Sequence, residues 1–402
     1  MKELKYFNQL SEYTADKDNF EYPTVSYVEE NKEVYYTEKE KPYAIYRTTG
    51  DSQEVRLFGY DSDEVKNYID KVTIEETGEV ITGNSYTFAN AGDHKVYIEL
   101  NPDITELGYY GGTGSHATNK TLFGYGDYSG ISELVSVSEN LFSNCPNIDN
   151  FDGTFIHCSG LTSIPENLFS NNTKVTSFTS TFASCTGLTG SIPANLFNNN
   201  TAVTNFRSTF NGCTGLTSIP ESLFSNNKAV TSFNSTFSGC SQLTSIPENL
   251  FSNNTAVTSF NNTFLSCRGL TSIPDNLFQY NTAVTDFDST FYGCKGLTSI
   301  PANLFSNNTN VTNFRSTFYY CDGLTSIPNN LFKYNTAVTN FMSTFDNCFG
   351  LTGNTPVDSD GTSIYNRSTP GKEGYTVVAY YGDCFYNCTG LTDYSSIPSG
   401  WK

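Results

Sequence analysis

The sequence predicts a mainly β protein, a solenoid of about nine 27-residue coils with a small N-terminal β-rich domain. Cysteines recur every 27 residues over much of the chain, with one interval of 28. The apolar residues of each repeat follow neither the helical period nor the strand period over any long window. Short extended pieces alternate with turns instead. One such repeat cannot bury its apolar face alone, so neighbouring repeats must stack.

The repeated unit is L-T-S-I-P-x-x-L-F-x-x-N-x-x-V-T-x-F-x-x-T-F-x-x-C-x-x. Its eight apolar positions are expected to form ladders in a continuous core. The longer interval comes from one extra residue near Gly190, in "LTGSIP". The recurring cysteines are Cys158, Cys185, Cys213, Cys240, Cys267, Cys294, Cys321 and Cys348.

The fixed polar residues have structural explanations. Asparagine bonds turn backbone and tolerates left-handed geometry, and proline ends a strand and presets the next turn. The recurring asparagine, as at Asn254, and the recurring proline, as at Pro247, are therefore interpreted as corners of the coil.

The eleven cysteines are interpreted as reduced, packed thiols. Stacked cysteines of one ladder point in parallel, which is the wrong geometry for a disulfide. Cys384 and Cys388 form C-x-x-x-C without a second pair nearby, which is insufficient for zinc. Cys145 occupies the position of the turn asparagine. "DSDG", at 358–361, is interpreted as a turn because the rest of a calcium loop is missing. No metal or cofactor is expected.

Five segments are predicted along the chain. They are a strand-rich N-terminal anchor at 1–70, a small immunoglobulin-like β module at 71–101, a Gly-rich linker or cap at 102–130, the repeat solenoid at 131–352, and an insertion loop with a C-terminal capping repeat at 353–402. Within the first, "TVSYVEENKEVYYTE" indicates a hairpin around Asn31 and Lys32.

The formal net charge is −19, and residues 1–100 carry 21 Asp and Glu against 11 Lys and Arg. An acidic chain is a poor match to a polyphosphate, so nucleic-acid binding is not expected. The N-terminal residues lack a continuous apolar run, and no later run reaches the ~18 apolar residues of a membrane span. We therefore expect no membrane insertion, and folding in the cytoplasm unless Met1 replaced a leader.

The words "VTSFNSTFSGCSQLTSIP" resemble the BspA-type leucine-rich repeat, with its F-x-x-C-x-x-L-T-x-I units. The resemblance covers roughly residues 131–352 and 384–402. It implies a right-handed leucine-rich-repeat solenoid with one strand per coil along one face. Members of the family are mostly surface proteins of anaerobic oral and gut bacteria and of some protists, associated with adhesion to proteins, glycans or cells. The repeat itself implies no enzyme activity.

The front segment "YPTVSYVEENKEVYY" is similar to short strand-rich openings of virion proteins from phages of gut bacteria. The leading hypothesis is therefore a phage virion component, a tail or head appendage assembled in the host cytoplasm. Its N-terminal domain would join other virion or surface proteins, and its repeat rod would contact a host-surface glycan or protein. The alternatives are a bacterial cell-surface adhesin and an architectural spacer without a ligand. The sequence leaves an oligomer open.

No catalytic arrangement is evident. His94, His116 and His157 lie in no Ser/His/Asp or Cys/His pattern, and phosphate-loop and HExxH motifs are missing. Residues that vary between repeats are expected to decorate the rod. Exposed tyrosine suits glycan stacking or protein contact because it offers a flat apolar area with a polar tip. The candidate ligand contacts, with surface drift as the competing explanation, are Tyr280, Tyr292, Tyr319, Tyr320 and Tyr334.

Overall fold

The structure is a computed structural model, and the chain forms two compact units, Met1–Pro42 and Tyr43–Lys402. We treat each unit by itself. The described residues are 4–7, 26–28, 33–37, 40–59, 67–109, 120–124, 131–368 and 373–402.

The first unit contains a three-stranded antiparallel sheet in the order β1-β3-β2. Its strands are β1 (Leu4–Phe7), β2 (Ser26–Val28) and β3 (Glu33–Thr37). Strands β2 and β3 pair with Val28 opposite Glu33, which agrees with the predicted hairpin. The turn residues Asn31 and Lys32 lie outside the described residues.

The second unit begins with a five-stranded antiparallel sheet in the order β12-β4-β9-β6-β7. Alternate residues of the long central strand β9 are buried, because one face of the sheet covers the core. A separate antiparallel pair is formed by β5 and β8. The strands are β4 (Tyr43–Thr48), β5 (Gln53–Arg56), β6 (Ile69–Ile74), β7 (Val80–Ile81), β8 (Ser85–Phe88), β9 (Gly92–Leu100) and β12 (Leu134–Val137).

This pairing divides the chain differently from the five segments expected from the sequence. Strand β4 lies in the expected 1–70 anchor, yet it pairs with β9 of the expected 71–101 module. Strand β12 belongs to the expected 131–352 solenoid, yet it pairs with β4. Residues from Tyr43 onward therefore form one unit with the repeats. Partners so far apart in sequence leave no local pattern, which is why the boundaries differ.

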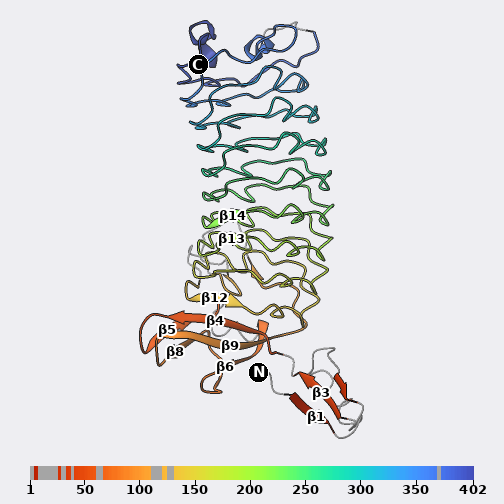
Figure 1. Ribbon diagram of the computed structural model, residues 1–402, viewed down its shortest axis with the longest axis vertical. Coiled ribbons are helices and arrows are strands. Elements are labelled where there is room, and N and C mark those ends of the chain that lie inside the picture. Colours follow the sequence, from red (N-terminus) through yellow and green to blue (C-terminus); the bar gives the residue numbers. More distant parts are fainter. Residues whose placement is uncertain are drawn as a thin grey trace. The chain divides into compact units, whose positions relative to one another are not determined.

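From residue 106 onward the described residues form stacked coils, as Figure 1 shows from the first repeats to the last. Each coil makes one parallel bridge to the next at the residue between V-T and F. The ladder starts in the expected linker, where β10 (Gly108–Tyr109) pairs with β11 (Lys120–Thr121). It also continues into the expected insertion. The bridges join Glu106, Asn150, Ser177, Asn205, Ser232, Ser259, Asp286, Asn313, Asn340 and Tyr380 in that order.

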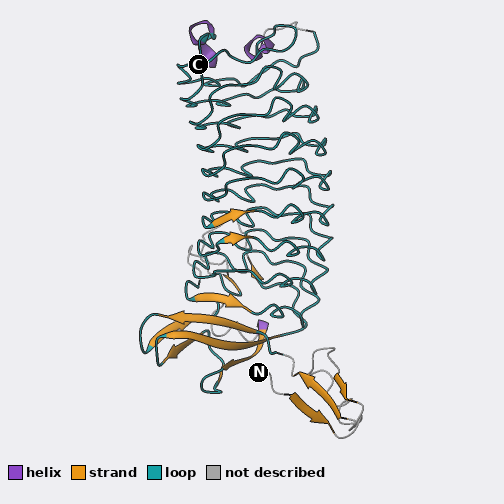
Figure 2. Ribbon diagram, in the orientation of Figure 1, coloured by secondary structure: helices purple, strands orange, loops and turns teal. Residues whose placement is uncertain are grey.

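Most coils contain turns and single bridges instead of the full strand that the family resemblance implied (Figure 2). The exceptions among the "LTSIP" segments are β13 (Gly190–Ser191) and β14 (Leu216–Ser218), which pair in parallel at the repeat with the extra residue. Proline in each "LTSIP" lacks an N–H and shortens the ladder there. Near the C-terminus the 3-10 helices η3 (Ile364–Ser368), η4 (Tyr394–Ser396) and η5 (Ser399–Trp401) replace the regular turns.

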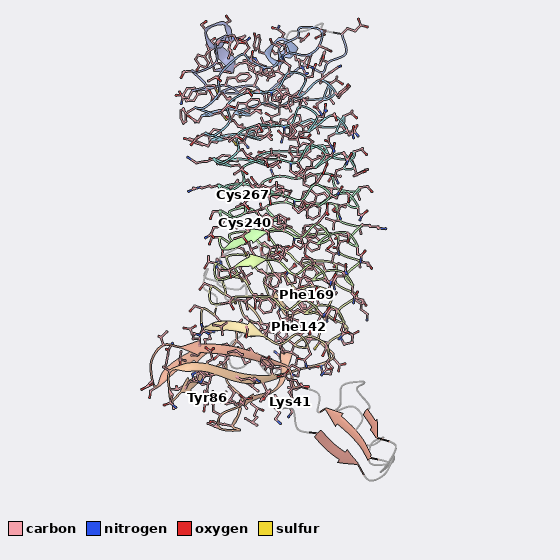
Figure 3. The ribbon with its side chains drawn as sticks, viewed as in Figure 1. Lys41, Tyr86, Phe142, Phe169, Cys240 and Cys267 are labelled. Carbon is pink, nitrogen blue, oxygen red and sulfur yellow. The ribbon has the colours of Figure 1, made fainter. Side chains whose placement is uncertain are left out.

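Three phenylalanine ladders run along the stack within the core, beside ladders of leucine, isoleucine, valine and cysteine. Phe233 stacks on Phe260 at 5.9 Å between ring centroids, and Phe237 on Phe264 at 5.8 Å. Figure 3 labels Phe142 and Phe169, which begin the third ladder at 5.9 Å. These rings are essentially inaccessible to solvent, so each coil depends on its neighbours for burial.

Polar side chains inside the stack bond the preceding coil. The Nδ2 of Asn254 donates to the carbonyl oxygens of Phe224 and Asn227, at 3.1 and 2.9 Å. The hydroxyl of Thr263 donates to the carbonyl of Phe233, and the thiol of Cys267 to that of Phe237, both at 3.0 Å. The asparagines thus tie successive coils together beside the apolar ladders, which is a structural role. The left-handed geometry considered from the sequence is not adopted, because none of the ladder asparagines has a positive φ.

At the C-terminal end of the stack, Arg367 continues the asparagine ladder. Its guanidinium donates to the carbonyl oxygens of Asn335 and Phe332, at 3.4 and 2.9 Å, which the asparagine of a further coil would have bonded. It also pairs with the buried Asp358, with 2.7 Å between Nη2 and Oδ2. Trp401 covers the same end and stacks on Tyr381 at 5.0 Å. Residues of the predicted insertion therefore close the stack.

Candidate binding surface

Three of the five candidate tyrosines lie together. Tyr292 and Tyr319 occupy the same position in successive coils, two residues before the ladder cysteine, and Tyr320 follows Tyr319. The rings of Tyr292 and Tyr319 stack at 4.7 Å between centroids. The ring of Tyr320 stands edge-on to that of Tyr319 at 4.5 Å. We call Tyr292, Tyr319 and Tyr320 the tyrosine ridge. All three side chains are half-buried, so part of each remains open to solvent.

Backbone hydrogen bonds between coils hold the ridge. The N–H of Gly293 donates to the carbonyl of Tyr319 at 2.7 Å, and that of Tyr320 to the carbonyl of Asp346 at 3.0 Å. The preceding coil is joined to the ridge in the same way, because the N–H of Ser266 donates to the carbonyl of Tyr292 at 2.6 Å. A site carried on such a rigid stack is preorganised, because little backbone freedom is lost when a partner binds.

The backbone of Tyr320 is left-handed, with φ of 56°. The residue before the ladder cysteine has positive φ in every repeat, and elsewhere it is glycine, serine or asparagine, apart from His157 in the first. A bulky residue in this conformation costs on the order of 1 kcal/mol relative to glycine, and such strain concentrates at functional sites. The aromatic ring at position 320 is therefore unfavourable for the fold and needs another explanation.

Charged groups flank the ridge. The ammonium of Lys295 lies 5.6 Å from the ring centroid of Tyr320 and pairs with Asp322, at 2.9 Å between Nζ and Oδ2. An ammonium near an aromatic face is attracted by the ring quadrupole. The ridge thus already contacts one cation of its own chain.

Asp346 occupies the repeat position of Tyr292 and Tyr319, two residues before the ladder cysteine, in the next coil. We call this repeat position the tyrosine column. Asp346 was not singled out from the sequence. It is 6 % exposed, and its Oδ1 has no hydrogen-bond partner in the described part of the chain. Burial raises the pKa of Asp346 to about 6, with a hydrogen bond from Ser343 opposing this and the charge of Asp383 adding to it. Burial, with Asp346 among the further causes, also raises the pKa values of Tyr292 and Tyr319.

Asp346→Asn is expected to stabilise the protein above about pH 6. A carboxyl with a raised pKa binds its proton more tightly in the folded state, so folding stability falls as pH rises from the ordinary Asp range to about 6. The amide removes that loss. After allowance for partial screening, we expect a gain of about 1 kcal/mol in the free energy of unfolding at pH 7.5 and none near pH 4.

Urea titrations of both proteins at the two pH values measure this difference. Asp275→Asn, which neutralises an exposed carboxylate, is the matched control for loss of one charge. An equal gain at pH 4 and 7.5, or the same gain from the control, contradicts the role assigned to Asp346.

Tyr280 and Tyr334 lie elsewhere. They share another repeat position, two residues after Leu-Phe in coils separated by the coil of Asn307, and are 51 % and 49 % exposed. The ammonium of Lys333 lies 5.2 Å from the ring of Tyr334. Neither tyrosine makes a ring contact with the ridge in the described part of the chain. The candidate set therefore separates into a cluster and two single side chains.

Further exposed apolar side chains were missed because they follow the last regular repeat or replace a residue beside the ladder cysteine. They are Phe349, Val377, Tyr380 and Tyr386. Tyr386 lies two residues before Cys388, which is the repeat position of Tyr319 and Asp346.

The described residues contain no group of three or more His, Cys, Asp or Glu side chains placed to hold a metal ion. All eleven cysteines are free and buried, and burial raises the pKa of Cys240 to about 12. His94 bonds Glu76 and Thr48 through its two ring nitrogens. Over the same ranges, no helix has the length and apolar character needed to cross a membrane.

Comparison with protein families decides the relationship. The model of the BspA type leucine rich repeat region matches in six copies, over residues 65–189, 127–206 and 190–339. These matches span more than half of the chain. The chain belongs to the BspA-type leucine-rich repeat family. The family resemblance seen in the sequence is thereby confirmed, and the BspA-type match reaches upstream of residue 131 into the N-terminal sheet.

A search of curated proteins gives no match. Among solved structures, the crystal structure of a TLR13–ssRNA13 complex is similar at 12 % identity and a TM-score of 0.13. That alignment covers 62 % of this BspA-type chain and 53 % of the other, so it spans about half the length of the matched chain. At this TM-score the similarity supports no functional argument.

Proposed function

We propose that this BspA-type protein is a non-enzymatic binding protein, in which a solenoid of about nine coils presents the tyrosine ridge to a protein or glycan. The observation that carries the proposal is the clustering of Tyr292, Tyr319 and Tyr320 on adjacent coils. Tyrosine is enriched at binding hot spots because it adds a large contact area at little entropic cost.

The strained backbone of Tyr320 supports the same proposal. In three coils this position holds glycine, at Gly212, Gly239 and Gly293, for which a positive φ carries no steric cost. A residue that opposes the local fold preference without a packing gain is typical of functional sites. The ring of Tyr320 contacts other ridge side chains and Lys295 instead of the core.

Tyr319→Ala/Tyr320→Gly is expected to leave the protein at least as stable as the wild type and to weaken partner binding about tenfold or more. Binding of the full chain to arrays of immobilised glycans and peptides, with urea titrations alongside, measures both effects. Tyr280→Ala/Tyr334→Ala, which removes two exposed tyrosines outside the ridge, is the matched control. Unchanged binding by the ridge variant removes the proposed surface.

We propose a phage virion appendage as the setting, because eleven buried free thiols suit assembly in a reducing compartment. In this setting the unit Met1–Pro42 and the sheet of β4, β6 and β9 would join other virion proteins. A bacterial cell-surface adhesin is the alternative that the BspA-type family favours. Capsid and portal genes beside this gene support the first, and an export leader upstream of Met1 supports the second.

A further inference from the structure

We infer that the tyrosine ridge binds lysine or arginine side chains of a basic segment in a partner protein, an inference that rests on the proposed binding function and names the partner's chemistry. Three observations carry it: an internal ammonium on the ridge, an unpaired buried carboxylate beside it, and the acidity of the chain.

The internal ammonium shows which chemistry the ridge accepts. The ammonium of Lys295 lies 5.6 Å from the ring centroid of Tyr320, although its side chain is 47 % exposed and is therefore not confined to this position by burial. Only one ring of the three is approached in this way by a lysine or arginine of the described chain. The outward parts of Tyr292 and Tyr319 therefore remain available to a cation from a partner.

The charged residues around the ridge also favour a positively charged partner group. Lys295 is already paired with Asp322, so that pair adds little net charge. Among the described residues no cation is paired with Asp346, and Asp383 lies close enough to influence it. Because Asp346 is shielded from water, its charge acts on nearby groups through a lower effective dielectric than a surface carboxylate. A guanidinium or ammonium over the adjacent rings would relieve this unpaired charge.

Long-range charge points the same way. The chain carries 41 Asp and Glu against 22 Lys and Arg. A field of this sign speeds the encounter with basic segments and opposes acidic ones. The ridge then supplies the short-range selectivity, because arginine stacks on aromatic faces and is itself a common hot-spot residue.

The test uses the full chain and three immobilised probes: a synthetic Arg-Ser repeat peptide, its Glu-Ser counterpart, and a neutral β-glucan oligosaccharide. We expect the Arg-Ser peptide alone to bind, and Tyr319→Ala/Tyr320→Ala, which keeps the net charge, to weaken binding about tenfold. Tyr319→Phe/Tyr320→Phe keeps the ring faces and should retain most of the affinity. Lys295→Gln removes the competing ammonium and should tighten binding severalfold.

Lys174→Gln, a lysine removed far along the stack, controls for the charge change of Lys295→Gln. If the alanine variant binds the Arg-Ser peptide as the wild type does, net charge alone explains the attraction and the inference is overturned. If the ridge variants lose the β-glucan instead, the proposed binding function stands and the cation preference is wrong. If no probe depends on the ridge, both fail.

Discussion

Arg367→Met is expected to destabilise the C-terminal end of the stack by about 3–5 kcal/mol. The substitution leaves Asp358, whose side chain is 4 % exposed, without its cation. It also removes the donors to the carbonyls of Asn335 and Phe332 and the guanidinium that lies 4.4 Å from the ring of Tyr375. In a stacked repeat, loss of a terminal cap exposes the last coil and lets unfolding start there.

The single tryptophan provides a local readout of this change. Trp401 is 1 % exposed and stacks on Tyr381 at the same end. We expect tryptophan fluorescence to report an early transition in urea while circular dichroism reports the rest of the stack later. Arg315→Met is the matched control, because the Arg315 side chain is 54 % exposed and its pair with Asp288 is long, at 3.8 Å.

A second variant separates the ion pair from the packing. Arg367→Met/Asp358→Leu removes both charges, so most of the lost stability should return, since replacing a buried pair by apolar residues is often neutral. If the double variant is as unstable as the single one, the hydrogen bonds of Arg367 to the coil matter more than the unpaired carboxylate.

The repeated residues could be predicted from the sequence because the same side chain recurs at the same place. Each Phe, Cys and Asn position is repeated often enough to show that it faces a copy of itself, and stacking follows from that. The structure agrees at Phe260, Asn254 and Cys267, all inaccessible to solvent.

The parts that could not be predicted depend on residues that occur once. Arg367 lies in an insertion and takes the place of a ladder asparagine. Its distance along the chain from the last ladder asparagine does not match the repeat length, so the sequence pattern gives no signal for it. Strand β4 pairs with β9 and β12, which are distant in the sequence. The sequence pattern therefore does not predict these pairings, and the structure is needed to see them. Asp346 had a visible signal, its place in the tyrosine column, but its burial depends on the irregular last coil.

The tyrosine ridge falls between these cases. The sequence shows that tyrosines gather in the later coils, but it groups Tyr280 and Tyr334 with the others. Repeat position separates them, because residues beside the ladder cysteine stack directly across coils and residues after Leu-Phe lie at another corner. Comparing the residues that occupy the same repeat position in successive coils identifies the tyrosine ridge, whereas counting tyrosines in each coil does not.

Asn254→Ala is expected to destabilise the middle of the stack by about 2–3 kcal/mol. The Nδ2 of Asn254 donates to the carbonyls of Phe224 and Asn227, and the side chain is fully buried. Each carbonyl keeps one N–H from its own turn, so neither becomes an orphan and the loss stays moderate. The Oδ1 has no partner in the described part of the chain, which reduces the loss further.

Asn254→Asp should be more damaging than alanine at neutral pH. A carboxylate would place negative charge against two carbonyl oxygens inside the core, where it cannot be solvated. Protonation removes that repulsion, so part of the stability should return near pH 4. The alanine variant shows no such recovery, and this difference separates charge from lost packing.

Asn253→Ala is the matched control, since Asn253 is the exposed neighbour of Asn254 in the same turn. Urea titrations followed by circular dichroism measure all three variants. Each coil contacts only its neighbours, so a substitution at Asn254 weakens the coupling between the coils before it and the coils after it. The urea unfolding transition should therefore become broader. Equal effects at Asn253 and Asn254 would show that the turn backbone, and not the bonds of the buried amide, holds the coils together.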